Sequence, residues 1–191
     1  FSEYFFSTSP IYWCLRALGV DLLHSYQGWI IGCCVLNFVA FYALARRVFT
    51  FAASWSAMGA YVFTFALPRL MQFGHSQLIA QFFVILSAFG ALRWWRDPRS
   101  KRAPVLFFMG ATLQLLNCFY FFWFWAWVLV IYAAYVGFSR PRRAVFRDWF
   151  AQVPKWWPLQ VLVGCALIAS PFLYHYLLVA REFGMRNWLV I

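Results

Sequence analysis

The sequence predicts an all-α protein that lies in a membrane, as a bundle of about six transmembrane helices plus one interfacial or re-entrant helix. Of its 191 residues, 65% are apolar, 24% are aromatic and only 11% are charged. A soluble domain carries about 25% charged residues, and a soluble fold of this composition would expose large apolar patches. The apolar residues form continuous runs rather than an alternating pattern, which favours helices over a barrel.

The first segment, residues 4–20, is less regular than the others. It is apolar and aromatic, but polar residues, a proline and Arg16 interrupt it, which is typical of an interfacial or re-entrant helix. A polar joint at 21–26 follows, in which we expect Asp21 to cap a helix.

Six apolar runs of about 15–21 residues come next, and about 20 residues suffice to cross the hydrocarbon core of a bilayer. The fourth and fifth runs are separated by little polar sequence and predict a tight helical hairpin, whereas Ser170 and Pro171 interrupt the sixth. We expect transmembrane helices at 27–45, 50–67, 78–92, 104–121, 122–138 and 158–178.

The chain reads as one transmembrane domain over residues 1–191. We expect 1–26 to be the end of an outer loop with its interfacial helix, 27–178 to hold the six spans, and 179–191 to be an outer segment. Because the sequence begins at Phe1 rather than Met and ends within an apolar stretch, we expect it to be an internal part of a longer protein.

Basic residues alternate between the two ends of the spans and indicate orientation. Joints on one side carry Arg16, Arg69, Arg181 and Arg186; joints on the other carry Arg46, Arg47, Arg93, Arg96, Arg99, Lys101, Arg102, Arg140, Arg142, Arg143, Arg147 and Lys155. The positive-inside rule places the second set in the cytoplasm. This accounts for the net charge of +11 without nucleic acid, which we do not expect as a partner. The basic, aromatic stretch 140–155 is expected to lie on the anionic inner leaflet.

Three short stretches carry a resemblance to a known family. The first is Phe1-Ser2-Glu3-Tyr4, an aromatic-Ser-Glu sequence that leads into a helix. The second is the basic end of a span, residues 42–47, followed by residues 66–69 and 74–78. The third is residues 118–121 at the outer hairpin, with residues 182–184 after Ser170 and Pro171. In this order they resemble bacterial polytopic membrane proteins of the C-type (GT-C) glycosyltransferase superfamily, which includes uncharacterised members.

The resemblance implies a GT-C-like fold in the bacterial inner (plasma) membrane. It also implies transfer of a hexosyl or pentosyl group from a polyprenyl-phosphate-linked donor on the extracytoplasmic face. The expected partners are this donor and the lipids of the membrane. A first transmembrane helix and most of a first outer loop would precede Phe1. That loop normally brings an acidic catalytic residue, which this sequence does not contain, and Tyr4 stands where the family often has histidine. The sugar, the acceptor and the oligomeric state stay open.

Transfer from a phospholipid-linked donor requires a carboxylate near the acceptor hydroxyl and cationic groups or a metal at the leaving phosphate. Glu3 is the candidate catalytic carboxylate; the simpler interpretation is a charge that stabilises a helix N-terminus. Arg69 is a candidate phosphate ligand or a snorkelling interface arginine. His75 is a candidate for binding phosphate or a divalent metal such as Mg²⁺ or Mn²⁺, or is structural. Gln77 lines a sugar cavity or joins helices.

Further candidates lie along the outer side. Tyr120 stacks on a sugar ring or belongs to an interfacial aromatic belt, and Arg181 and Glu182 contact donor phosphate or pair with each other. Gln114 and Asn117, three residues apart near the outer end of a span, are expected to hydrogen-bond across helices.

The alternative function is a non-enzymatic transporter or a lipid flippase-like protein. Its path would be lined by intramembrane polar residues: Asn37, Gln81, Gln114 and Asn117. Against it, no predicted span contains a buried charged residue that could couple ions, and no inverted repeat is visible. A scaffold that merely spans the membrane is the third interpretation.

Overall fold

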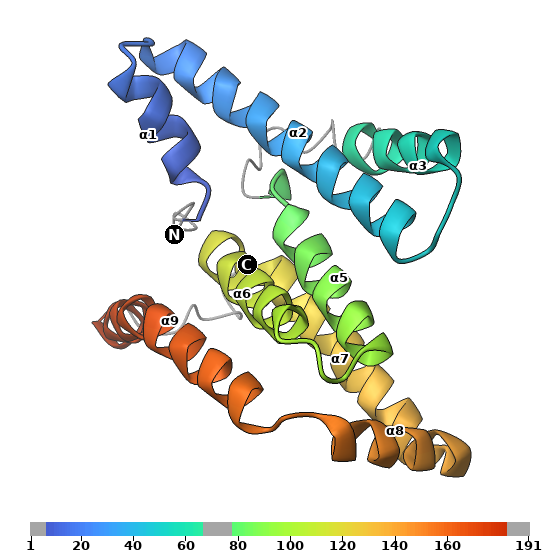
Figure 1. Ribbon diagram of the computed structural model, residues 1–191. Helices are drawn as coiled ribbons and strands as arrows, with labels where there is room; N and C mark the ends of the chain where they lie inside the picture. Colours follow the sequence, from blue (N-terminus) through green and yellow to red (C-terminus); the bar gives the residue numbers. More distant parts are fainter. Residues whose placement is uncertain (1–6, 67–77, 183–191) are drawn as a thin grey trace, which may run out of the picture.

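A computed structural model describes residues 7–66 and 78–182, and within these ranges the chain is helical and contains no strand. This confirms the all-α prediction. The helices, shown in Figure 1, are α1 (Ser9–Ala17), α2 (Leu22–Arg47), α3 (Ala53–Phe65), α5 (Phe82–Arg96), α6 (Arg102–Asn117), α7 (Phe119–Phe138), α8 (Arg140–Gln152) and α9 (Trp156–Glu182).

Three of the described helices are long and apolar enough to cross a membrane: α2, α7 and the Trp156–His175 part of α9. Helices α3, α5 and α6 have 13, 15 and 16 residues. At a rise of about 1.5 Å per residue they reach about 20–24 Å, which is less than the ~30 Å hydrocarbon core. A membrane protein is therefore supported, with three helices of spanning length where the sequence predicted six.

The predicted hairpin between the fourth and fifth spans has its break at Cys118 rather than at 121–122. Cys118 is extended, with φ −153° and ψ 111°, and its backbone N–H closes α6 on the Gln114 carbonyl at 2.8 Å. Asn117, the last residue of α6, is buried and hydrogen-bonded to other segments. Asn117 is the polar residue at this break, but the apolar run resumes directly after it, so hydropathy did not locate the end of α6.

The expected interruption of the sixth span at Ser170 and Pro171 is wrong, because α9 continues through both residues to Glu182. Pro171 has no N–H to donate to the carbonyl of Leu167, one helical turn earlier. The hydroxyl of Ser170 donates to that carbonyl at 2.9 Å. A side chain thus replaces the missing backbone hydrogen bond, which is how proline is tolerated in membrane helices.

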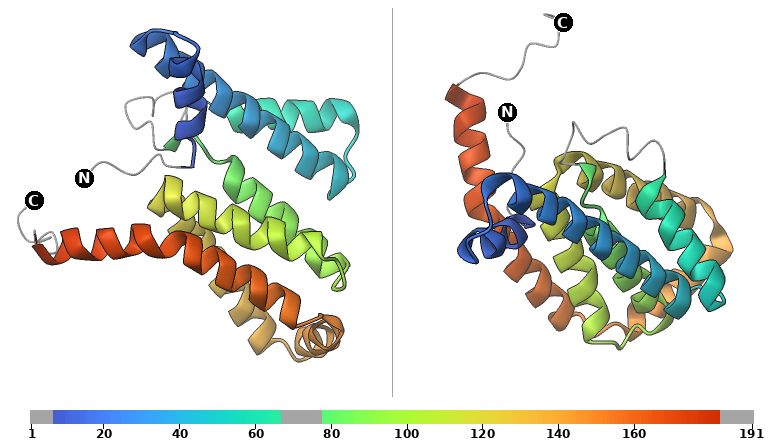
Figure 2. Two further views of the ribbon diagram at one scale, coloured as in Figure 1. Left: turned by 60° about the vertical axis from the view of Figure 1, so that its left-hand side comes forward. Right: turned by 90° about the horizontal axis from the view of Figure 1, so that it is seen from above.

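The helices form two groups that meet at α2 and α5 (Figure 1). Helices α1 and α3 pack against α2, while α5 pairs with α6, and α6 in turn contacts α7 and α9. The connections α2–α3, α5–α6 and α8–α9 lie toward one end of the molecule. The α1–α2 joint and the α6–α7 turn lie toward the other (Figure 2, left). The basic joints therefore gather at one end, as the alternation of charge predicts.

Helices α5 and α6 pack backbone to backbone. A Cβ atom added at Gly90 of α5 would lie 2.9 Å from the carbonyl oxygen of Ala103, and one added at Gly110 of α6 would lie 2.7 Å from the backbone nitrogen of Ser87. The Ser87 hydroxyl donates to the Phe107 carbonyl at 2.8 Å across the same contact. Small residues that let backbones approach closely are the usual basis of helix pairing in membranes.

Candidate functional site

Most of the residues that the sequence singles out for chemistry lie outside the described residues. Glu3, Arg69, His75 and Gln77 all do, as does the side chain of Glu182. Tyr120, in the first turn of α7, is 54% exposed, and Arg181 is exposed in the last turn of α9. Among the described residues, no hydrogen bond, ion pair or ring contact joins Tyr120 to Arg181.

A buried amide cluster, made of Asn37, Gln114 and Asn117, lies where α2 and α6 meet the start of α5. The three side chains are at most 1% exposed. Each directs hydrogen bonds at the backbone of residues 79–81, just before α5 begins at Phe82. Gln114 and Asn117 form the expected bonds outside their own helix, but with residues 80 and 8, which lie just before α5 and α1, rather than with the neighbouring helices themselves.

Asn37 makes the shortest bond of the amide cluster. Its Nδ2 donates to the Ile79 carbonyl at 2.7 Å, and its Oδ1 accepts from the Gln81 N–H at 3.0 Å. The first N–H groups of a helix, and the carbonyl and N–H groups of the turn before it, have no partner within the helix. A primary amide, which both donates and accepts, can satisfy two such groups at once. Asn37 thereby fixes the entry of the chain into α5.

Gln114 and Asn117 approach the same segment from α6. Both side-chain nitrogens are directed at the Ala80 carbonyl, at 3.4 and 3.5 Å, while the Oε1 atom of Gln114 is buried and has no partner among the described residues. The Oδ1 atom of Asn117 accepts from the Thr8 hydroxyl at 2.9 Å.

Residues 7 and 8 were missed as site residues by the sequence reasoning. Thr8 is 1% exposed and bonds Asn117, and the Ser7 hydroxyl donates to the Leu113 carbonyl at 2.9 Å. A signal was present, because three consecutive hydroxyl residues at 7–9 interrupt an apolar stretch and buried hydroxyls require partners. The distance along the chain to residue 117 concealed that partner.

The amide cluster therefore joins two segments that carry sequence-predicted candidates. Residues 7 and 8 directly follow the segment that contains Glu3, and Ile79 lies two residues after Gln77. The amides are neutral, so the cluster itself performs no acid or base chemistry. It can hold in place residue 8, which follows the Glu3 segment, and residues 79–81, which follow Gln77.

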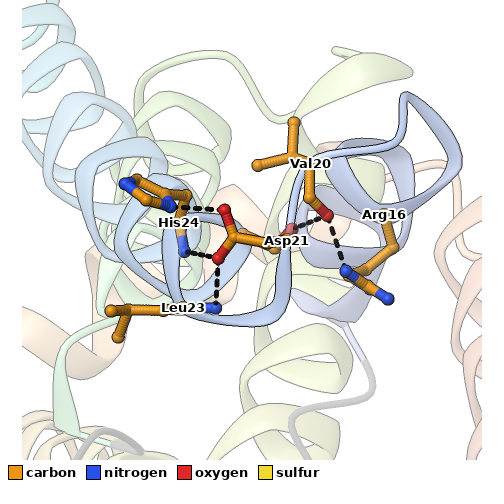
Figure 3. Close-up of polar contacts among 6 residues, drawn as sticks. Arg16, Val20, Asp21, Leu23 and His24 are labelled. Atoms are coloured by element: carbon orange, nitrogen blue, oxygen red, sulfur yellow. Dashed lines mark hydrogen bonds and ion pairs between the residues drawn. The ribbon is translucent and has the colours of Figure 1, made fainter.

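Ionisable side chains meet at the joint between α1 and α2, where the predicted cap is confirmed. Asp21 Oδ1 accepts from the N–H groups of Leu23 and His24 at 3.0 and 3.1 Å, and Oδ2 contacts the His24 imidazole. Figure 3 shows Arg16 turned away from this carboxylate, its guanidinium donating to the Val20 carbonyl. The backbone N–H of His24, and then its imidazole, hold the pKa of Asp21 below its ordinary value of 3.8.

This cap predicts a pH-dependent stability. Because the folded pKa of Asp21 is lowered, its contribution is present above about pH 4 and is lost as the pH falls through the folded pKa. Thermal unfolding in detergent is measured from about pH 6 to about pH 3. The wild type should lose more stability than Asp21→Asn, which keeps a capping oxygen without the charge. If the unfolding temperatures of the two proteins fell equally with pH, the Asp21 carboxylate would make no such contribution.

Within the described ranges, no three histidine, cysteine, aspartate or glutamate side chains come together as a metal-binding group. An apolar groove of about 450 Å³ does lie along α2 and α3. It is lined by Ile30, Ile31, Cys34, Val35, Phe38 and Phe65.

Comparison with known proteins found no matching family model, no matching curated protein and no matching solved structure.

Proposed function

We propose that this chain is part of a membrane-embedded glycosyltransferase with a GT-C-like fold, which transfers a sugar from a polyprenyl-phosphate donor on the extracytoplasmic face. In this proposal the six predicted runs all lie in the bacterial plasma membrane, the shorter α3, α5 and α6 included. The basic joints face the cytoplasm, and the amide cluster and the α1–α2 joint lie toward the opposite face.

The observation that carries the proposal is the meeting of two segments at the amide cluster. Glu3 and the Arg69–Gln77 stretch are far apart in sequence. Ser7 and Thr8, which follow the first, and Ala80, which follows the second, nevertheless all hydrogen-bond residues at the end of α6. A transfer site needs a carboxylate and phosphate ligands in one place. Fixed ends for the two segments, close to one another, favour such a site.

The apolar groove gives a second line of support. A polyprenyl donor has a long hydrocarbon chain that must lie against apolar surface while its phosphate reaches the membrane boundary. The groove follows α2, a helix of spanning length, and its lining is entirely apolar. Its chemistry suits a hydrocarbon chain and excludes a sugar.

The chemistry assigns one role to each side chain. Glu3 takes the proton of the acceptor hydroxyl while the oxygen of that hydroxyl attacks the anomeric carbon of the donor sugar. The bond from the anomeric carbon to the phosphate oxygen breaks. Arg69 binds the departing polyprenyl phosphate through paired N–H donors, and His75 hydrogen-bonds the same group. Tyr120 packs against a sugar ring. Glu3 and His75 are also the expected ligands of any divalent cation, and no step of this transfer depends on one.

The test compares sugar transfer by Glu3→Gln with transfer by the wild type. The full-length protein is assayed in membranes with labelled polyprenyl-phosphate hexose and pentose donors. Loss of the base should reduce transfer at least about a hundredfold. Asp97→Asn is the matched control, because it removes an exposed carboxylate at the opposite, basic end. Undiminished transfer by Glu3→Gln would show that Glu3 is not the catalytic carboxylate.

The alternatives have distinct outcomes. A transporter would move labelled lipid across vesicles without any transfer, and a scaffold would respond to Arg69→Gln or His75→Ala only in abundance. Asn37, Gln114 and Asn117, which a transport path would use, are buried and bonded to backbone or to Thr8 in this structure.

A further inference from the structure

The basic end of the molecule is assembled from two separate segments. Trp149 of α8 donates through Nε1 to the Trp94 carbonyl at 2.9 Å, and its ring packs on Trp94 and Trp95 with centroids 5.3 and 5.5 Å away. At the start of α9, Trp157 donates to the Lys101 carbonyl at 2.7 Å. The end of α5, the α5–α6 connection and α8 therefore form one surface, which we call the basic platform (residues 93–102 and 140–155).

The basic platform carries a strong excess of positive charge. Each of its two segments contributes five basic residues, and all ten are exposed. Its acids are Asp97 and Asp148, and the latter pairs with Arg147 at 3.8 Å on the exposed surface. Exposed pairs of this kind neutralise little, so most of the positive charge is available to a partner.

Helix α8 also presents apolar side chains beside these bases. Arg143 and Arg147 are four residues apart, as are Phe146 and Phe150, and each arginine precedes one of the phenylalanines by three residues. These spacings place the four side chains on one side of the helix. Phe146 is 40% exposed and Phe150 is 47% exposed, although both rings partly pack on aromatic neighbours. Basic and aromatic residues side by side are typical of a helix that lies in the plane of a membrane interface.

The position of α8 in the chain identifies the partner. It follows α7 directly and precedes α9, and both of these helices are long and apolar enough to cross a membrane. A helix that connects two spans at the same end lies at the bilayer boundary. We propose that the basic platform is a binding surface for anionic phospholipids of that leaflet, with the arginines on the phosphates and Phe146 and Phe150 among the first acyl carbons. This surface lies at the opposite end from the proposed transfer site and does not depend on it.

The experiment measures lipid preference directly. The full chain in neutral detergent is titrated with phosphatidylglycerol and with phosphatidylcholine of the same acyl chains, and bound lipid is read by native mass spectrometry. Each base near an anionic surface contributes about 1 kcal/mol, which is about fivefold in affinity. Arg143→Gln should reduce the preference for phosphatidylglycerol about fivefold, and Arg143→Gln with Arg147→Gln about twentyfold or more.

The matched control is Arg16→Gln, which removes one exposed arginine at the opposite end and should leave the preference unchanged. Raised salt should weaken the preference in the wild type. Inorganic phosphate at the lipid concentration should not compete, because it cannot use the exposed aromatic side chains. An equal loss in Arg16→Gln, no loss in the double variant, or full competition by phosphate would each overturn the proposal.

Discussion

Replacing Gly110 by alanine should force α5 away from α6 and strongly destabilise the fold. The added Cβ would meet the backbone of Phe83 and Ser87 at 2.7–3.0 Å, and backbone atoms cannot rotate away as a flexible side chain can. Overpacking usually costs about 1–3 kcal/mol, and we expect Gly110→Ala to reach at least the upper value. The equivalent change at Gly90, which faces the α6 backbone, should have a similar effect. The free energy of unfolding in detergent, measured by chemical denaturation, checks both.

Gly137→Ala and Gly164→Ala are the matched controls. Both glycines lie within helices, and a Cβ at either would meet nothing within 4 Å. Alanine is favoured over glycine in a helix by about 0.5–1 kcal/mol, so these variants should be as stable as the wild type or slightly more stable. If all four variants behaved alike, the close α5–α6 approach would not determine stability.

Replacing Asn37 by leucine should have the second largest effect. Leucine has a similar size but makes no hydrogen bond, so the Ile79 carbonyl and the Gln81 N–H would both lose the bond that Asn37 provides. Ile79 is buried, and its carbonyl without a partner costs about 1–3 kcal/mol, whereas Gln81 is half-buried, so its N–H adds less and a loss of about 2–3 kcal/mol is expected. The unfolding free energy of the purified variant gives the measurement.

Gln160→Leu provides the comparison for Asn37→Leu. Gln160 is an amide on the exposed surface of α9, where such a change is usually worth less than about 0.5 kcal/mol. Proposed sugar transfer should also fall in Asn37→Leu, because the stretch that ends at Gln77 would lose the fixed backbone at residues 79–81 that follows it. If both variants lost a similar amount of unfolding free energy, the hydrogen bonds of Asn37 would not contribute to stability.

The sequence predicts the features that depend on neighbouring residues. Asp21 is recognisable as a cap because its partners are two and three residues away. The basic and aromatic character of 140–155 is likewise visible in its own residues, although the helix α8 within it was not predicted. The polarity of Gln114 and Asn117 within an apolar run already indicates that they require partners. That polarity does not indicate that the partners are residues 8 and 80, which lie just before α1 and α5.

Features that depend on distant contacts could not be predicted in this way. Nothing in the sequence distinguishes Gly110, which touches another backbone, from Gly164, which has open space beside it. Thr8 is an ordinary hydroxyl residue until Asn117, 109 positions later, lies beside it. The continuous helix at Pro171 depends on the rotamer of one serine, and hydropathy carries no information about that rotamer.

The glycine-based pairing of α5 and α6 has a consequence for the order in which the chain assembles. These helices are separated by only five residues, so their contact requires little loop-closure entropy and can form as soon as both have been synthesised. The hydrogen bonds of the amide cluster join residues that are separated by 34 to 44 positions, or by 109 positions in the Thr8–Asn117 bond. They can form only after the helices that carry both partners have come together. The α5–α6 hairpin should therefore form early, as should the α2–α3 pair, which is also separated by five residues, and the amide cluster should then join the two pairs.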